Sequence, residues 1–289
     1  MSSSGALPIS AVIATCNRPD QCKNLLASLA QQEERLEEVI FCDASDDNLT
    51  FELVSATATH LRARNPGAAA QRNEGVAAST QPFVMFMDDD ILLEPGCLGA
   101  MWKVMQSQVD IGGVTATIVN EAYVHPGKWT RALLRWFEGG HLRASYAGAC
   151  VGPGMTFWPA NDPDAPESLP LEWMGTTCVL YRKEVLPSPP FPPLFKGASL
   201  AEDLWLSLTV GKTAPMLQAT RAKFVHINVG GPHKQNLREM AAMGLVNRHH
   251  IMTEVLGRRS ARHQFQFAVM MLFSIAGVLA QGRVRDTFL

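Results

Sequence analysis

Three consecutive carboxylates are the group in this sequence whose chemistry is easiest to identify. Asp88, Asp89 and Asp90 follow directly after five apolar residues, Phe83–Met87. Adjacent carboxylates repel one another and raise one another's pKa, so folding gains little from placing them together. A divalent cation removes this conflict, and oxygen ligands suit Mn²⁺ or Mg²⁺ when water and phosphate complete the coordination. The triplet therefore predicts a metal site, while an acidic turn before the helix that Pro95 starts explains the same residues without a metal.

Asp203 is a second candidate for chemistry. It stands near the start of a helical pattern over residues 199–208. Glu202 fits the capping-box spacing with Ser199, which predicts a structural role for Glu202. Asp203 has no such explanation, although the helix dipole favours any carboxylate in a first turn.

His226 is the third candidate, and it lies in an apolar run over residues 223–229. Histidine in an apolar strand is more often a satisfied core residue than a ligand, and imidazole suits Mn²⁺ less well than oxygen. The residue type alone therefore leaves both roles open.

Short apolar runs separated by helical patterns predict the elements that position these groups. Strands are expected over residues 9–14, 38–42 and 83–87, and each ends in polar residues, namely Thr15–Asp20, Asp43–Asp47 and Asp88–Asp90. Strands that alternate with helices indicate βαβ units, in which the carboxyl ends of the strands bind ligands. Neither G-x-G-x-x-G nor G-x-x-x-x-G-K-[ST] is present, which disfavours a dehydrogenase and a P-loop enzyme.

The second half of the chain is less regular. A strand is expected over residues 111–119 and another over 175–181, but residues 120–171 show no periodic pattern. Long irregular segments in compact domains are usually functional loops. We therefore expect residues 120–171, which include Trp129, Trp136 and Trp158, to help form an acceptor pocket.

The composition is that of a globular protein with an uneven charge. The chain has 289 residues, is 47% hydrophobic and carries a net charge of −2. From Arg221 onward, ten Lys or Arg residues stand against three acids, so this part has a charge of +7 and the first 220 residues have −9. The asymmetry predicts that the C-terminal end faces an anionic ligand or a membrane surface.

The six cysteines form no C-x-x-C pair, and several lie in apolar runs, as buried free thiols do. The N-terminus lacks the basic and apolar regions of a signal peptide. Both observations predict reduced thiols and a cytoplasmic protein.

The C-terminal segment contains fourteen uncharged, mostly apolar residues, 267–280, which follow the basic run 258–263 and are flanked by Arg283 and Arg285. This is shorter than the roughly twenty residues that span a bilayer. Such a helix lies at a membrane interface, packs against a partner subunit or covers its own core, and the sequence leaves these three roles open.

Taken in order from Ile9 to Asn247, several blocks resemble the family 2 inverting glycosyltransferases, which have the GT-A fold. The matching blocks are Val12–Arg18, Asp43–Asp47 with Ala44 in place of a glycine, Asn65–Gly75, the Asp-x-Asp signature Asp88–Asp90, Gly175–Glu184, the pair Glu202-Asp203, and His226 with Gly230 and Gly231 behind it. Any single block is weak, but the ordered set is specific.

The resemblance implies an α/β fold with a nucleotide-binding, Rossmann-like mixed sheet flanked by helices. It implies a GT-A domain over residues 1–235, with a nucleotide-sugar half of about 1–120 and an acceptor half of about 121–235. Residues 236–289 are expected to form a C-terminal helical extension.

The resemblance also implies roles for individual residues. Asp203 is expected to be the catalytic base. Asp43 is expected to contact the nucleobase of the donor, and Asp88 is expected to contact its ribose. The full expected set is Asp203 for catalysis; Thr15, Arg18, Asp43, Arg72, Asp88 and Asp89 for the nucleotide-sugar; Asp90 and His226 for the metal; and Trp173, Thr176 and Glu202 on the acceptor side.

The implied activity is metal-dependent, inverting transfer of a hexosyl or deoxyhexosyl group from a nucleoside diphosphate sugar. The expected acceptor is a hydroxyl of a glycan or a lipid-linked molecule in polysaccharide biosynthesis, in the cytoplasm or at the inner face of the membrane, with no role for nucleic acid. Two alternatives are a non-catalytic nucleotide-sugar-binding subunit and a sugar nucleotidyltransferase. The glycine-rich loop of the latter is absent after Ala14.

Overall fold

The computed structural model describes residues 5–121, 123–227 and 237–280 of the chain. The described residues do not include Gly230 and Gly231, which belong to the matching block at His226. They also do not include Arg283 and Arg285, which follow the C-terminal apolar segment.

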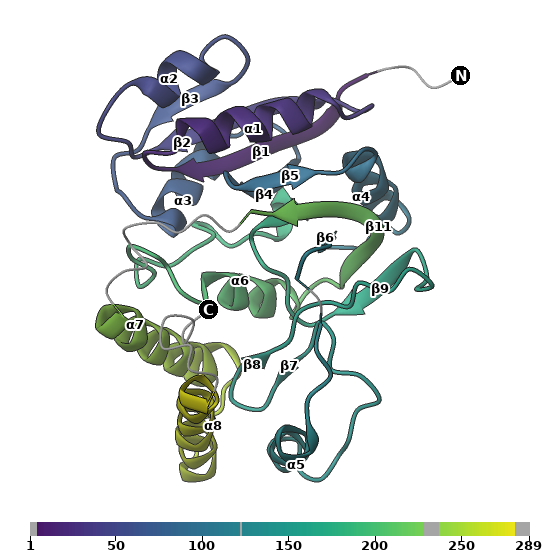
Figure 1. The fold of residues 1–289 in the computed structure, drawn as a ribbon, viewed down its shortest axis with the longest axis vertical. Coiled ribbons are helices and arrows are strands. Elements are labelled where there is room, and N and C mark those ends of the chain that lie inside the picture. The colour runs from purple at the N-terminus through teal and green to yellow at the C-terminus, as the bar shows by residue number, and fades with distance from the viewer. Residues whose placement is uncertain (1–4, 122, 228–236, 281–289) are drawn as a thin grey trace.

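The described residues form helices on both sides of a central sheet (Figure 1). The strands are β1 (Leu7–Thr15), β2 (Leu36–Asp43), β3 (Thr59–Arg62), β4 (Phe83–Asp88), β5 (Ile91–Leu93), β6 (Gly113–Ile118), β7 (Cys150–Val151), β8 (Met155–Thr156), β9 (Ser168–Leu171), β10 (Cys178–Arg182) and β11 (Met216–His226). The helices are α1 (Pro19–Ala30), α2 (Leu49–Val54), α3 (Ala68–Ala78), α4 (Cys97–Gln106), α5 (Lys128–Phe137), α6 (Glu202–Val210), α7 (Leu237–His250) and α8 (Ala261–Ala280), with a 3-10 turn η1 (Lys183–Val185) and a π-helical turn η3 (Ile251–Val255).

The sheet has the order β3-β2-β1-β4-β10-β6-β11-β5, and β9 also pairs with β11. Strands β3, β2, β1 and β4 are parallel, β10 is antiparallel to both its neighbours, and β11 is parallel to β6. Because β10 reverses direction, β11 ends at the same edge of the sheet as β1, β2 and β4, and β10 starts there. The predicted mixed α/β sheet is confirmed.

Alternate side chains of each strand enter two different cores, as the pleat of a buried sheet requires. On one face, Ile13 and Met87 pack with α1 and α4. On the other face, Val12 and Phe86 pack with α3, α6 and η3. Strands β1 and β4 are therefore covered on both sides, which explains why they are mostly apolar.

A third, smaller core joins the C-terminal helix to the segment that the sequence predicts to be irregular. Leu134 and Phe137 of α5 pack with Phe267 and Met270 of α8, and with residues around the β7–β8 hairpin. The prediction that residues 120–171 lack regular structure is therefore partly wrong, because α5, β7, β8 and β9 lie within them.

The predicted capping box at the start of α6 is also wrong. The helix begins at Glu202 after Ala201, which has a left-handed backbone with φ of 67°, and no side chain caps it. The hydroxyl of Ser199 instead accepts a hydrogen bond from the amide of Ala69 at 3.1 Å. The side chain of Glu202 accepts a hydrogen bond from Arg72 instead.

All six cysteines are free thiols, as predicted. None of the described helices combines the length and the apolar character that a bilayer span requires.

Helix α3 approaches the sheet closely at Gly75. A Cβ atom at this position would lie 2.4 Å from Cγ1 of Val12 and 2.8 Å from the thiol sulfur of Cys42, both buried. We expect Gly75→Ala to lower the free energy of unfolding by about 1–3 kcal/mol, because neither strand can move away.

Gly277→Ala is the matched control, since no atom lies within 4 Å of a Cβ at that helical glycine. It is expected to leave stability unchanged or to raise it by up to about 1 kcal/mol. Urea unfolding of the two variants tests the comparison, and equal stability would contradict the close approach of α3.

Candidate active site

The predicted functional residues gather at the edge of the sheet where β1, β2, β4 and β11 end. Thr15, Asp43 and Asp88 are the last residues of β1, β2 and β4, and the parallel register places them side by side. Thr177, just before β10, accepts a hydrogen bond through its carbonyl from the amide of Asp88 at 3.0 Å. The strand order thus builds one polar edge from distant parts of the sequence.

The three carboxylates of the triplet have three different sets of neighbours. Asp88 accepts a hydrogen bond from Arg72 at 2.6 Å. Asp89 accepts one from the hydroxyl of Thr15 at 2.7 Å and one from Arg18 at 2.8 Å. Burial raises the pKa of Asp89 to about 6, against the opposing effect of Arg18 and Thr15. The Nη1 atom of Arg18 that donates to Asp89 also lies 3.4 Å from Asp90. The triplet is therefore not a plain acidic turn, because each of its carboxylates has a charged or hydroxyl partner from another element.

Asp90 is directed toward His226. The Nε2 atom of His226 lies 3.3 Å from Oδ1 of Asp90, and its Nδ1 atom lies 3.2 Å from Oε1 of Glu121. Burial lowers the pKa of His226, but hydrogen bonds to Asp90 and Glu121 outweigh it and raise that pKa to about 10. The imidazole therefore lies between two carboxylates, with one near each ring nitrogen.

Asp88, Asp90 and His226 could together hold a metal ion. One ligand atom from each lies within 4.8 Å of the others. Glu121 contacts the second nitrogen of the imidazole, as the outer carboxylate does beside many metal-bound histidines, where it fixes the ring orientation. Two oxygens and one nitrogen suit Mn²⁺ or Mg²⁺, with the remaining positions left for phosphate or water.

A short strand that the sequence analysis missed brings the histidine to the triplet. β5 pairs with β11 so that Ile91 lies opposite His226, and the amide of Ile227 donates to the carbonyl of Asp90 at 2.9 Å. The sequence analysis predicts no element for the apolar run Ile91–Leu93, which is only three residues long. Glu121 was also missed, although it follows the end of a predicted strand.

Arg72 of α3 connects the end of β4 to the start of α6. Its Nη2 atom donates to Asp88, and its Nη1 atom donates to Oε1 of Glu202 at 2.8 Å. The hydroxyl of Thr176 also donates to Oε1 of Glu202, at 3.4 Å. Burial raises the pKa of Glu202, and the cation of Arg72 opposes this rise. One buried guanidinium thus holds a carboxylate from β4 and a carboxylate from α6.

Asp203 follows Glu202 in the first turn of α6 and is half-buried near Trp173. Burial raises its pKa, while the amide of Leu204, Arg248 and the indole of Trp173 favour its charged form. The ring of Trp173 packs against Trp158 with centroids 4.8 Å apart. Arg248, on α7, was not predicted, and its only sequence signal was the basic excess of the C-terminal part.

Asp43 lies deeper than the other predicted residues. Its exposed fraction is 0%. Its carboxylate accepts hydrogen bonds from the amide and the hydroxyl of Ser45 and lies 2.9 Å from Nε2 of His60. Contact between Asp43 and a nucleotide base stays a prediction, and it requires His60 or Ser45 to move.

A family model described as Glycosyl transferase family 2 matches residues 10–157, slightly more than half of the chain. No curated protein sequence matches the chain. Among solved structures, a glucosyl-3-phosphoglycerate synthase from Mycobacterium tuberculosis, in complex with Mn²⁺, UDP and phosphoglyceric acid, is similar with 16% identity and a TM-score of 0.54, over 86% of this chain and 78% of that one.

Two further structures have similar folds. A mannosyl-3-phosphoglycerate synthase from Rubrobacter xylanophilus is 14% identical with a TM-score of 0.55, over 88% of this chain and 76% of that one. GalNAc-T7 with UDP, GalNAc and Mn²⁺ is 13% identical with a TM-score of 0.62, over 88% of this chain and 48% of that one. At these identities the similarity shows the fold.

The bridge made by Arg72 has a measurable consequence for stability. In Arg72→Met, two buried carboxylates lose their cation, so we expect the free energy of unfolding to fall by about 3–5 kcal/mol at neutral pH. The loss should be smaller at acidic pH. With the cation gone, the folded-state pKa of Glu202 stays above its unfolded value, so protonation relieves the penalty.

Arg259→Met is the matched control. Arg259 is exposed and pairs with Glu254 at 2.6 Å, so its removal should change stability by less than about 1 kcal/mol. Urea unfolding of both variants at acidic and neutral pH tests this. An equal loss of unfolding free energy in the two variants would show that Arg72 does not stabilise the two buried carboxylates.

Proposed function

Because the chain belongs to glycosyl transferase family 2, we propose that it transfers a sugar from a nucleoside diphosphate sugar to an acceptor hydroxyl with inversion at the anomeric carbon. That it is a glycosyltransferase follows from the family and the fold. The observation that carries the finer proposal is the contact of Arg72 with both Asp88 and Glu202. It puts the metal-binding carboxylates and the neighbouring Asp203 on one side of the molecule, as a single displacement requires.

The donor is proposed to lie along the ends of β1, β2 and β4. Thr15, Arg18, Asp43 and Asp89 would contact the nucleotide, with Arg72 toward the diphosphate and Asp88 toward the ribose. Arg18 is half-buried and already bonded to a carboxylate, which supports a fixed orientation for its guanidinium. The Mycobacterium tuberculosis structure and GalNAc-T7 both contain UDP, which supports a nucleoside diphosphate at the same edge.

The metal is proposed to be Mn²⁺ or Mg²⁺ held by Asp90 and His226, with Asp88 within reach as a third ligand. The two similar structures that contain UDP also contain Mn²⁺. When bound, such an ion neutralises charge on a departing diphosphate. Glu121 orients His226 for this role through the second ring nitrogen.

Asp203 is proposed to be the base. The acceptor oxygen attacks the anomeric carbon, the bond from that carbon to the diphosphate oxygen breaks, and its electron pair leaves with the diphosphate. The proton of the acceptor hydroxyl passes to the carboxylate of Asp203. A single displacement of this kind inverts the anomeric carbon and needs one base on the acceptor side.

The acceptor is proposed to be a glycan or a lipid-linked molecule that binds between Trp173, Thr176 and Glu202. Trp158 is 36% exposed and packs against the buried Trp173, so its ring is an aromatic surface that an acceptor could contact. The division into a donor half over residues 1–120, an acceptor half over 121–235 and a C-terminal extension belongs to this proposal.

Asp203→Asn removes the base but keeps the size of the side chain. We expect kcat for sugar transfer to fall by about 10²–10⁴-fold, while the Kd for the nucleoside diphosphate stays within a factor of a few. Transfer assays and calorimetric titration with UDP and Mn²⁺ measure the two quantities. Loss of donor binding, or unchanged transfer, would remove Asp203 from the role of base.

The same assignment predicts a pH dependence. Asp203 must be charged to accept a proton, and burial raises its pKa. The acid-side fall of kcat/KM should therefore occur at higher pH than for an exposed aspartate, with activity gained as the pH rises through that pKa. A pH profile that shows no such limb would contradict the assignment.

Removal of the metal should abolish transfer, and Mn²⁺ or Mg²⁺ should restore it. Glu121→Gln is expected to weaken Mn²⁺ binding by about 10–100-fold, because an outer partner of the imidazole is lost. Glu33→Gln, at an exposed site on the connection before β2, is the control and should bind as the unaltered chain does. Calorimetric titration with Mn²⁺ in the presence of UDP measures this, and full activity in EDTA would contradict a metal.

A further inference from the structure

Helices α5 and α8 present a basic aromatic face at one end of the molecule. We define this face by Lys128, Trp129, Arg131, Trp136, Arg262 and Phe265, all of which are exposed. Figure 1 shows α5 and α8 at the end of the molecule opposite to β1, β2 and β3. Trp129 and Trp136 lie in the segment that the sequence predicts to help form an acceptor pocket, and none of the six residues is among those proposed to bind the donor or the metal or to act as the base.

The two helices are held together through buried side chains and through two members of the face, Trp136 and Phe265. Leu134 and Phe137 of α5 share a core with Phe267 of α8, and the rings of Trp136 and Phe265 meet edge to face with centroids 6.0 Å apart. Their outer sides therefore keep a fixed relation to each other. The side chain of Trp129 is 86% exposed, and no described residue covers it.

An apolar stripe continues from this face along α8. Phe265 is 63% exposed and Leu272 is 66% exposed, and Ile275 follows at helical spacing. Exposed apolar residues of this size, three and seven positions apart, form one side of a helix. The face thus combines exposed rings, an aliphatic stripe and cations.

The charge of the face has one sign. Neither α5 nor α8 contains an Asp or Glu residue. Glu138, just after α5, bonds to Arg143 at 2.6 Å and so does not neutralise the exposed cations Lys128 and Arg131. An excess of exposed cations on one face attracts an anionic surface.

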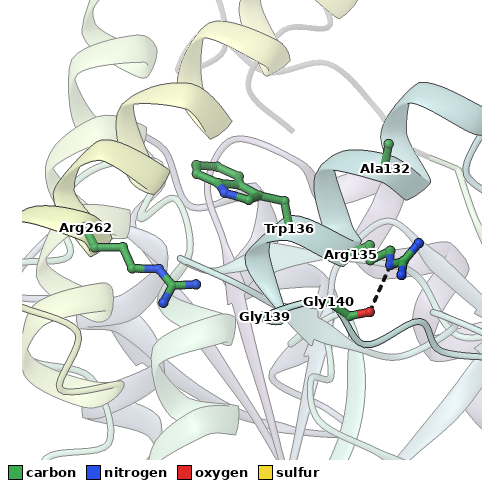
Figure 2. Close-up of a pocket in the computed structure, with 6 residues that line it drawn as sticks. All are labelled: Ala132, Arg135, Trp136, Gly139, Gly140 and Arg262. Carbon is green, nitrogen blue, oxygen red and sulfur yellow. Dashed lines mark hydrogen bonds between the residues drawn. The ribbon is translucent and has the colours of Figure 1, made fainter.

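A hollow of about 340 Å³ lies between the two helices and is lined by Arg135, Trp136, Gly139, Gly140 and Arg262, with Ala132 at its side. Figure 2 shows Trp136 reaching from α5 toward α8 and Arg262 reaching from α8 toward α5. The Nε atom of Arg135 donates to the carbonyl of Gly140 at 2.9 Å, which fixes its guanidinium at the rim. Two guanidinium groups beside a tryptophan ring suit an anionic headgroup above and a buried acyl chain beside it.

From this arrangement we propose that the basic aromatic face docks on an anionic lipid bilayer. Exposed tryptophans among cations, with apolar residues on the adjacent side, are characteristic of helices that lie in the membrane interface. A second copy of the chain fits less well. A two-fold contact would place the face against itself, and Lys128, Arg131 and Arg262 would meet the same cations of the partner.

The docking also deepens the proposed function, and in this respect it rests on that function. Helix α6, which carries Asp203, lies between the sheet and the end formed by α7 and α8 (Figure 1), and it packs with η3, which precedes α8. A bilayer at this end would place the acceptor side of the site toward the membrane. The acceptor class favoured is then a lipid-linked hydroxyl and not a free glycan.

Vesicle flotation of the full chain tests the docking without any need for catalysis. The probes are vesicles of phosphatidylcholine alone and of phosphatidylcholine mixed with phosphatidylglycerol. We expect binding to the mixed vesicles that weakens as salt is added. The double variant Lys128→Glu and Arg131→Glu should lower the partition coefficient on them at least about tenfold.

Two controls accompany this measurement. The double variant Lys23→Glu and Arg35→Glu makes the same change of charge at exposed sites in α1 and before β2, and it should bind as the unaltered chain does. Trp129→Ser should reduce binding several-fold without a change of charge. Because these side chains are exposed, we expect each variant to keep the Tm of the unaltered chain. An unchanged Tm excludes loss of the fold as the cause of weaker binding.

Three results would overturn the proposal. They are equal binding to neutral and mixed vesicles, equal loss in the two charge variants, and a dimer in solution that the α5 variant alone disrupts. Asp203→Asn, which should float with the mixed vesicles as the unaltered chain does, separates docking from catalysis. If the chain transfers sugar but does not bind the mixed vesicles, the docking proposal is wrong and the proposed glycosyltransferase activity stands.

Discussion

The site depends on one buried cation between two carboxylates. Arg72 bonds to Asp88 from β4 and to Glu202 from α6, and those elements belong to different halves of the chain. A charge buried in this way is tolerated only when it is paired, so the two halves can pack only when both acids reach it. The guanidinium reaches them because α3 lies close to β1 and β2, and Gly75 makes that closeness possible. The close packing of α3 against β1 and β2 therefore also determines where the guanidinium of Arg72 lies in the site.

Much of the donor half could be predicted because its signals are local. An apolar strand followed by carboxylates places its own end at the sheet edge, and the block around Arg72 lies within a single helix. The predicted capping box does not form, because both of its residues bond to partners that are distant in the sequence. Ser199 and Glu202 have the right spacing, but Ser199 bonds to α3 and Glu202 to Arg72, and no local pattern reports a partner about 130 residues away.

The remaining gaps also concern pairing between distant segments. The apolar run at β5 is three residues long, so nothing in it distinguishes a strand from the approach to a helix. Its antiparallel pairing with β11 is what joins His226 to Asp90. Arg248 and Glu121 were hidden for the same reason, since each acts through a residue far away in the sequence. Helix α5 lay inside a stretch rich in glycine, proline and tryptophan, where its short amphipathic pattern did not stand out.

The antiparallel strand β10 has an effect on how such a protein can change. Because β6 and β10 are neighbours that run in opposite directions, the chain leaves β6 after Ile118 and enters β10 at Cys178 beside the point where it left. Between these points Glu121 contacts His226 and β9 pairs with β11. The residues from α5 to the β7–β8 hairpin form an excursion outside the main sheet, so its length and content can vary at little entropic penalty. Recognition of a new acceptor could evolve by replacing this excursion while the strands that face the nucleotide stay as they are. Grafting residues 128–156 from a relative, which leaves Glu121 and β9 in place, is therefore a natural route to altered specificity.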